Sequence, residues 1–417
     1  MNRKQLTLLI VVGLVLGGLA LMFRNSRDQE FQRRDVGIGE KLLGDFPSED
    51  IVAVTIKSRD GEVNLAKEGV WVVRERSSYP ASFSQISELV RKLWDLKPAQ
   101  SQNVGQSQWG RLELLPPDSK DAGTNTATLV ELKAKDGKIV GAVLLGKKQM
   151  RDSGSPGGGY PVGRWIALPG KTDTVFVASE TFSDIEPKPE AWLNKDAFLK
   201  VEKLKSISLV ATNPAQSWSL VRTNETSDWA FVEPREGEDL DKGKVSSLNW
   251  AFSSPSFTDV QKRDSETLKD PFASPSVIRM GTFEGFTYEI TVSSPNESDN
   301  YWLTVSASAD LPKERVAPAD ESAEDKEKNE KAWKEQQDKL KEKLKKEQAL
   351  AGWAFQVAKW TVDSVLKDRS ALLAEKKAPD AGAPATEGGF NATPPPLPGA
   401  EPDSPPVVVP LDPPPIN

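Results

Sequence analysis

The stretch that decides the fold of the first domain reads DIVAVTIKSRDGEVNLAKEGVWVV, residues 50–73. Apolar residues alternate over 50–58, and β-type runs follow at 62–67 and 70–74. Asp60-Gly61 and Gly69 separate these runs, as turn residues do between paired strands. The stretch therefore predicts an antiparallel meander.

An amphipathic helix is predicted directly after the meander. Its apolar residues recur at helical spacing and should pack on the sheet, at Ile86, Leu89, Val90, Leu93 and Trp94. Ser82 and Gln85 are spaced as a capping box at its start. This helix and the strands together indicate an α+β domain.

The remaining strands of the first domain follow a second turn signal. Asp136-Gly137 separates 128–133 from 139–145, a spacing typical of a β-hairpin. Two more strands are expected at 165–168 and 175–178, and the domain should close near Leu193.

The apolar pattern then starts again, which predicts two tandem repeats of one domain. The matching positions are Ile51, Val54 and Ile56 with Leu204, Ile207 and Leu209; Trp71 with Trp229; Ile86, Leu89 and Leu93 with Val245, Leu248 and Phe252; Trp165 with Trp302; and Val177, Phe182, Ile185 and Leu193 with Val357, Val362, Val365 and Leu373. The offset, which is the difference in residue number between matching positions, rises from 137 at Trp165 to 180 at Val177. This rise indicates an insertion of 43 residues in the second repeat.

The insertion, placed at about 310–350, is rich in charge. Residues 324–347 contain 9 Lys and 8 acidic residues without Gly or Pro, which predicts a solvated helix. Trp333, Leu340 and Leu344 share a narrow face, which would touch a partner or fold back on its own domain.

The C-terminal end has a different composition. Residues 378–417 contain 13 of the 31 Pro, five acidic residues and no basic ones, so we expect a disordered or polyproline-like tail. It would act as a spacer, although PPPLP at 394–398 could instead dock in an aromatic groove.

The composition excludes several functional classes. The net charge of −7 without a Lys/Arg cluster argues against nucleic acid as a partner. Cys and His are both absent, which removes thiolate nucleophiles, imidazole bases and the usual ligands for zinc. We therefore expect a protein that is not an enzyme, with no catalytic, cofactor-binding or metal-binding residue and no cofactor.

Residues 6–23 are uncharged and apolar, and a helix of this length could cross a bilayer. A cleaved signal peptide is the alternative, but no small-residue cleavage site follows before Arg24. The segment predicts a transmembrane anchor in the lipid bilayer. It also predicts a single-pass inner-membrane protein with most of the chain in the periplasm, although the Arg residues after the segment leave its orientation open.

Two stretches resemble phosphate-binding motifs but lack features that those motifs require. Gly170-Lys171-Thr172 resembles the end of a P-loop, but Trp165 stands where that motif requires glycine. A tight turn at 169–171 is the better interpretation. The Gly-rich stretch 154–159 lacks a following helix pattern, so we interpret it as a loop.

Acidic residues and Trp leave one alternative function open. The acidic loop 233–241 lacks the Gly and Glu of an EF-hand, because Lys244 and Trp250 occupy those positions. Its carboxylates could serve glycan cleavage if exposed Trp lay beside them in a cleft, but capping of the next helix is the simpler role. The recurring Trp residues, such as Trp71 and Trp229, are expected in the core.

Three stretches carry a resemblance to a known family: residues 50–73, LKVEKLKSISL at 199–209, and SDIEPKPEAWLNKDAFLKV at 183–201. They resemble the bacterial domain-of-unknown-function family 4340 over about Phe46 to Leu373. Members are often encoded beside gliding-motility-type ABC transporter subunits. The resemblance implies an accessory protein with transporter subunits as partners, and it supplies no catalytic residue.

The predicted organisation is a short basic N-terminus (1–5), the anchor (6–23), a linker (24–45), repeat domain 1 (46–197), repeat domain 2 (198–377) and the tail (378–417). The predicted function is a non-enzymatic, membrane-anchored accessory or scaffold protein that binds other envelope proteins. The alternative is an envelope protein that binds or cleaves glycans.

Overall fold

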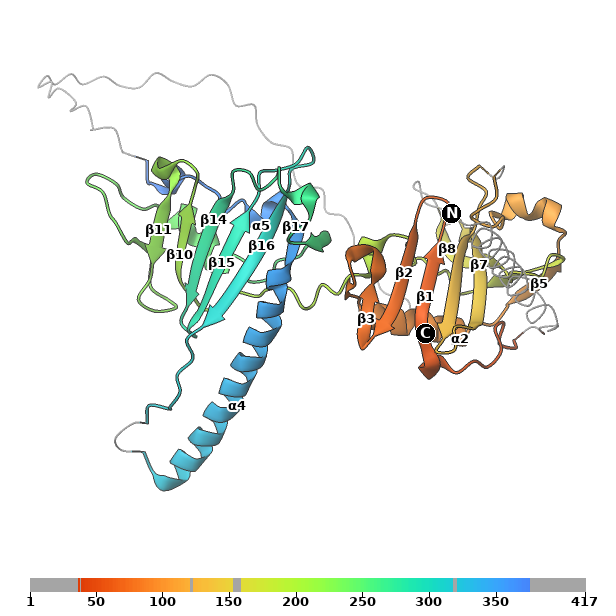
Figure 1. Cartoon of the computed structure of the whole chain (residues 1–417), viewed down its shortest axis with the longest axis horizontal. Coiled ribbons are helices and arrows are strands. Elements are labelled where there is room, and N and C mark those ends of the chain that lie inside the picture. The colour runs from red at the N-terminus through yellow and green to blue at the C-terminus, as the bar shows by residue number, and fades with distance from the viewer. Residues whose placement is uncertain (1–36, 38, 121–122, 153–158, 318–320, 376–417) are drawn as a thin grey trace, which may run out of the picture. The chain divides into compact units, whose positions relative to one another are not determined.

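The computed structural model describes residues 37, 39–120, 123–152, 159–317 and 321–375 (Figure 1). The described residues up to Ala374 belong to one compact unit. This unit contains two antiparallel sheets. We call the part built on the first sheet lobe 1 (residues 46–197) and the part built on the second lobe 2 (residues 198–375).

Lobe 1 is built on a nine-stranded sheet with the order β4-β3-β2-β1-β6-β7-β8-β9-β5. Its strands are β1 (Ile51–Lys57), β2 (Glu62–Glu68), β3 (Val70–Val73), β4 (Tyr79–Pro80), β5 (Gln100–Asn103), β6 (Thr128–Ala134), β7 (Ile139–Arg151), β8 (Tyr160–Ala167) and β9 (Thr174–Ala178). The meander predicted from residues 50–73 forms the first three of these. Gly69 and Gly137 turn the chain with positive φ, a conformation that favours glycine.

Lobe 2 is built on an eight-stranded sheet with the order β12-β11-β10-β14-β15-β16-β17-β13. Its strands are β10 (Leu204–Val210), β11 (Trp218–Val221), β12 (Ala230–Phe231), β13 (Asp259–Lys262), β14 (Ser276–Thr282), β15 (Phe286–Val292), β16 (Asn300–Ala309) and β17 (Trp353–Ala358). Apart from β4, the strand order of lobe 1 is repeated in lobe 2.

The pairing registers define equivalent positions in the two lobes. Val54 pairs with Leu65, and Ile207 pairs with Leu220 in the same place. One strand further, Lys67 pairs with Trp71, and the register of β11 with β12 brings Trp229 to the matching position. Trp165 and Trp302 are likewise equivalent, but Val177 is matched by Gln356 and not by Val357 as predicted.

One helix covers the sheet of lobe 1. The helix α2 (Phe83–Trp94) buries Ile86, Leu89, Val90 and Leu93 in the hydrophobic core, as its periodicity predicts. Ser82 is the N-cap residue, but its side chain makes no capping hydrogen bond, so the predicted capping box is wrong.

The corresponding segment of lobe 2 forms only one α-helical turn, α3 (Lys242–Val245), followed by a 3₁₀ helix, η6 (Ser246–Trp250). Val245, Leu248 and Phe252 are nevertheless buried. The sequence of this segment, KGKVSSLNW, contains residues of low helix propensity, which shorten the helix while its apolar positions still anchor it.

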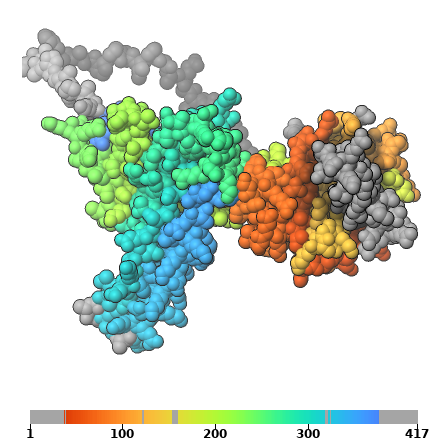
Figure 2. Space-filling view, viewed as in Figure 1, coloured from red at the N-terminus to blue at the C-terminus, as the bar shows by residue number. Residues whose placement is uncertain are grey.

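The charged segment forms α4 (Ala323–Gln348), which leads through the 3₁₀ helix η8 (Ala349–Gly352) into β17. Its C-terminal half packs on lobe 2: Leu340 and Leu344 contact the core, and Figure 2 shows this end meeting the surface of the sheet. Glu347 is only 4% exposed and accepts a 2.8 Å hydrogen bond from the Tyr288 hydroxyl. The apolar face of this helix therefore folds back on its own lobe.

The predicted fold class is wrong. The described residues are mainly antiparallel sheet with few helices, because the segment expected to form a second packed helix in lobe 2 supplies little more than a turn. The sequence periodicity overstated the helical share, since buried positions at helical spacing can also be held by a 3₁₀ segment and its loop.

The expected single-pass inner-membrane location is contradicted as well. Among the residues that the structure describes, no helix has both the length and the apolar character needed to cross a bilayer. The segment predicted as the anchor and lipid contact, 6–23, lies outside the described residues, as does the predicted tail, 378–417.

Candidate functional site

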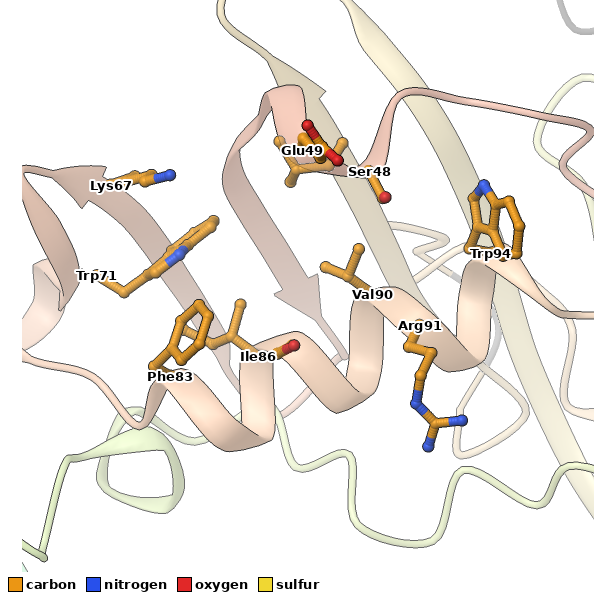
Figure 3. Close-up of a pocket in the computed structure, with 11 residues that line it drawn as sticks. Ser48, Glu49, Lys67, Trp71, Phe83, Ile86, Val90, Arg91 and Trp94 are labelled. Atoms are coloured by element: carbon orange, nitrogen blue, oxygen red, sulfur yellow. The ribbon is translucent and has the colours of Figure 1, made fainter.

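An apolar groove in lobe 1 lies between α2 and the meander (Figure 3). Its volume is about 440 Å³. It is lined by Ser48, Glu49, Ile51, Lys67, Trp71, Phe83, Ile86, Ser87, Val90, Arg91 and Trp94. Other hollows of similar size, under α4 and beside the 3₁₀ helix η7 (Glu266–Leu268), have more polar and charged residues in their linings.

The apolar lining of the groove combines buried and exposed side chains. Trp71 on β3 and Ile86 and Val90 on α2 are buried against the core. Phe83, one helical turn before Ile86, is 66% exposed at the rim. An exposed phenyl ring beside a groove with an apolar lining is a feature of surfaces that bind other proteins.

Charged groups occupy two sides of this groove. Figure 3 shows Lys67 and Glu49 on the sheet side, whereas Arg91 extends from α2. Within the described part of the chain, neither Lys67 nor Arg91 has a carboxylate partner in an ion pair. Two cations against one carboxylate give the rim a net positive charge.

The position equivalent to this groove in lobe 2 is filled. Arg222, the counterpart of Lys67, is 8% exposed. Its guanidinium donates to the Leu204 carbonyl at 2.6 Å and to the Asn249 side-chain oxygen at 3.1 Å. Trp229, the counterpart of Trp71, donates to the same Asn249 oxygen at 2.9 Å. Burial lowers the pKa of the Arg222 guanidinium, and its hydrogen bonds and the face of Trp229 compensate its lost hydration.

A second hollow of lobe 1, between α2 and the segment after β9, is nearly closed by ion pairs. In lobe 1, Lys92 forms ion pairs with Glu88, Glu180 and Asp184 at 3.1, 3.7 and 3.4 Å. Burial opposes protonation of Lys92, but the three carboxylates outweigh it and raise the pKa of the ammonium. These groups leave a space of only about 40 Å³.

Lobe 2 has a hollow of about 210 Å³ next to Ala251, the residue that the offset of 159 matches with Lys92. None of the residues that line this hollow is charged, so no ion pair of its lining closes it. Trp250 and Trp360 line it, and they are 76% and 65% exposed.

The motifs singled out in the sequence have structural roles. Residues 169–171 form the expected tight turn, in which the Lys171 amide donates to the Leu168 carbonyl. Asp241 in the acidic loop caps α3 by accepting from the amides of Gly243 and Lys244. Most of the stretch 154–159 lies outside the described residues.

The acidic loop also holds the C-terminal part of lobe 2. Glu238 accepts two hydrogen bonds, at 2.8 and 2.7 Å, from the buried Arg369. In the described part of the chain, no group of three or more acidic residues is placed to hold a metal ion. None of these carboxylates lines the hollow beside Trp250.

The sequence predicted burial correctly for some Trp side chains but not for all of them. Trp71 and Trp229 are buried, and Trp94, Trp165 and Trp302 are partly buried, as expected for packing residues. Trp250 and Trp360 were missed as surface residues. A signal was present for Trp250, because the offset of 159 matches it with the charged Arg91.

Comparisons with known proteins identify one family. Residues 71–271 match the model of a domain of unknown function, DUF4340, a range that begins in β3 and ends after η7. No curated protein matches the chain, and no solved structure matches it either. The match supports the resemblance to this family, over a shorter range than the Phe46 to Leu373 expected from the sequence.

Proposed function

We propose that this protein is a non-enzymatic accessory or scaffold component that binds other proteins through the groove of lobe 1. The observation that carries the proposal is the apolar groove with Phe83 exposed at its rim and its equivalent filled in lobe 2. Because the equivalent position is closed in lobe 2, the open groove is a specific feature of lobe 1 and not a general property of the fold.

The groove favours one kind of partner. An apolar side chain would enter between Trp71, Ile86 and Val90, where burial is favourable at about 25 cal/mol per Å². An acidic residue beside it would meet Lys67 or Arg91, which would orient the segment and speed its association. The partner is therefore a protein segment that carries apolar residues next to a carboxylate.

We further propose that lobe 2 is a second copy of the domain of lobe 1, and that the protein works with an ABC transporter system. The shared strand order and pairing registers support the duplication. The transporter link rests on the family resemblance alone. Transporter subunits are therefore the first candidates for the partner with the acidic segment.

The test is quantitative affinity capture of the tagged full-length protein from its own host. Phe83→Asp should remove a defined set of captured proteins, because it places a carboxylate beside the apolar lining. Val232→Asp is the matched control, since Val232 is also an exposed apolar residue but lies in lobe 2. Transporter subunits within the lost set would support the whole proposal.

Two results would overturn it. If Phe83→Asp and Val232→Asp capture the same proteins in the same amounts, the groove is not the binding surface. If the groove-dependent set contains no transporter subunit, protein binding stands but the transporter link is wrong.

A further inference from the structure

The hollow in lobe 2 is a second candidate site, independent of the groove in lobe 1. Its lining combines two exposed indoles with four hydroxyl-bearing residues and no charged one: Trp250, Ala251, Phe252, Ser253, Ser254, Pro255, Trp360, Thr361 and Ser364.

The two indoles are the most exposed of the described Trp side chains. Trp109, Trp192, Trp218 and Trp229 donate their ring N–H groups to oxygen acceptors at 2.7–3.2 Å. No such bond joins Trp250 or Trp360 to another described residue, so their N–H donors are available to a ligand. Exposed Trp contributes to binding through its large, rigid, amphipathic surface.

Hydroxyl groups lie beside the two indoles. Ser253, Ser254 and Ser364 line the hollow and are partly or fully exposed, so their hydroxyls are accessible to a bound molecule. Thr361 also lines the hollow, but its side-chain oxygen is buried and does not face a ligand.

We propose that this hollow binds one ring of a neutral saccharide. The apolar C–H face of a sugar ring stacks on an indole, and its hydroxyls exchange hydrogen bonds with Ser. The absence of charge in the lining disfavours acidic sugars, which would have to be desolvated without a cation. A volume of about 210 Å³ is below the roughly 300–1,000 Å³ of sites that enclose drug-sized molecules, so it suits a single ring of a longer chain.

The site binds and does not cleave. Glycoside hydrolysis uses two carboxylates across the sugar, and none of the residues that line the hollow is acidic. This binding activity is separate from the proposed protein partner of lobe 1, so either can fail without the other.

The experiment is a titration of the full-length protein with cellotriose, chitotriose and maltotriose, followed by intrinsic Trp fluorescence and calorimetry. We expect at least one of these sugars to bind. Trp250→Ala and Trp360→Ala should each weaken it roughly tenfold or more. Ser364→Ala removes an accessible hydroxyl of the lining and should weaken binding about five- to tenfold.

Phe83→Ala is the matched control, because it also removes an exposed aromatic ring but in lobe 1. It should leave the affinity unchanged, and raising the salt concentration should have little effect because the lining is neutral. Circular dichroism would show that each variant keeps its fold, as expected for exposed Trp side chains.

Failure of all three sugars to bind, or binding that survives loss of both Trp residues, would overturn the proposal. Octaproline is the competing probe, since polyproline segments also dock between aromatic rings. Saturable binding of octaproline together with no response to the sugars would assign the hollow to proline-rich peptides and overturn the saccharide proposal.

Discussion

The two lobes share one strand order, yet each presents a different open hollow. Lobe 1 has an open groove beside Lys67 and closes a second place with the Lys92 ion pairs. Lobe 2 fills the groove with Arg222 and has an open hollow lined by Trp250 and Trp360. A few side chains on a common scaffold therefore decide where each lobe presents a binding surface.

The comparison also shows two ways of closing a hollow. Arg222 is buried and bonded to neutral acceptors, the Leu204 carbonyl and the Asn249 amide. Lys92 instead attracts three carboxylates that remain partly exposed. The buried hydrogen bonds of Arg222 contribute more to stability than the ion pairs of Lys92. When one partner of a buried bond is removed, the other stays buried and cannot form a hydrogen bond with water instead.

The largest effect is expected from removing the residue that closes the groove in lobe 2. Arg222→Ala should lower the free energy of unfolding by about 2–4 kcal/mol, since it leaves a cavity and unpaired acceptors. Lys67→Ala, at the equivalent but exposed position, should change it by less than about 0.5 kcal/mol. Chemical denaturation of both variants tests this, and equal losses would contradict the contrast between the lobes.

The next effect concerns Glu347, for which lobe 1 has no counterpart because α4 is inserted only in lobe 2. Burial raises the pKa of Glu347 above its usual value, although the Tyr288 hydroxyl partly offsets this. Because this pKa is higher in the folded protein, Glu347 contributes its full stabilisation at pH values below its unfolded-state pKa. The contribution is lost as the pH rises through its folded-state pKa.

Glu347→Gln stays neutral at every pH and should remove this dependence. Relative to the variant, the wild-type protein should be most stable at acidic pH and should lose stability as the pH rises through the raised pKa of Glu347. Thermal unfolding at a series of pH values provides the measurement, with Glu335→Gln on the exposed face of α4 as control. A pH profile shared by all three proteins would show that Glu347 is not held in the neutral form.

A smaller effect is expected from opening the closed place in lobe 1. Lys92→Ala copies the Ala251 of lobe 2 and should cost about 0.5–1 kcal/mol, the range for partly exposed ion pairs. The loss should shrink in high salt, because salt screens such pairs. Denaturation at low and high salt checks this, and a salt-independent loss would point to packing of the Lys92 stem instead.

The smallest effect on stability is expected from adding a charge to the hollow of lobe 2. Ser254→Glu changes an exposed residue of its lining and should change the free energy of unfolding by less than about 0.5 kcal/mol. It should nevertheless strongly weaken binding of the neutral trisaccharide, because it places a long charged side chain in the lining. Retention of binding with full affinity would place the sugar elsewhere.

Local sequence patterns were sufficient for most of lobe 1. Alternation and turn residues predicted β1 to β3, the Asp136-Gly137 turn and the pairing of β6 with β7, because these features depend on neighbours in the chain. The same reasoning overestimated the helix of lobe 2, since Val245 and Leu248 are buried at helical spacing without an extended helix. It also missed the candidate site, because the groove is formed by residues from η1 (Ser48–Asp50), β1, β2, β3 and α2.

By itself, the sequence determined most strands of lobe 1, their turns, the helix face of α2 and the absence of Cys and His chemistry. Only the tertiary structure decided which aromatic residues are covered. Trp229 and Trp250 are 21 residues apart, yet one is buried and the other is exposed. The reason is that exposure depends on the packing of distant segments: Asn249 and Arg222 contact Trp229, whereas Trp250 lines an open hollow.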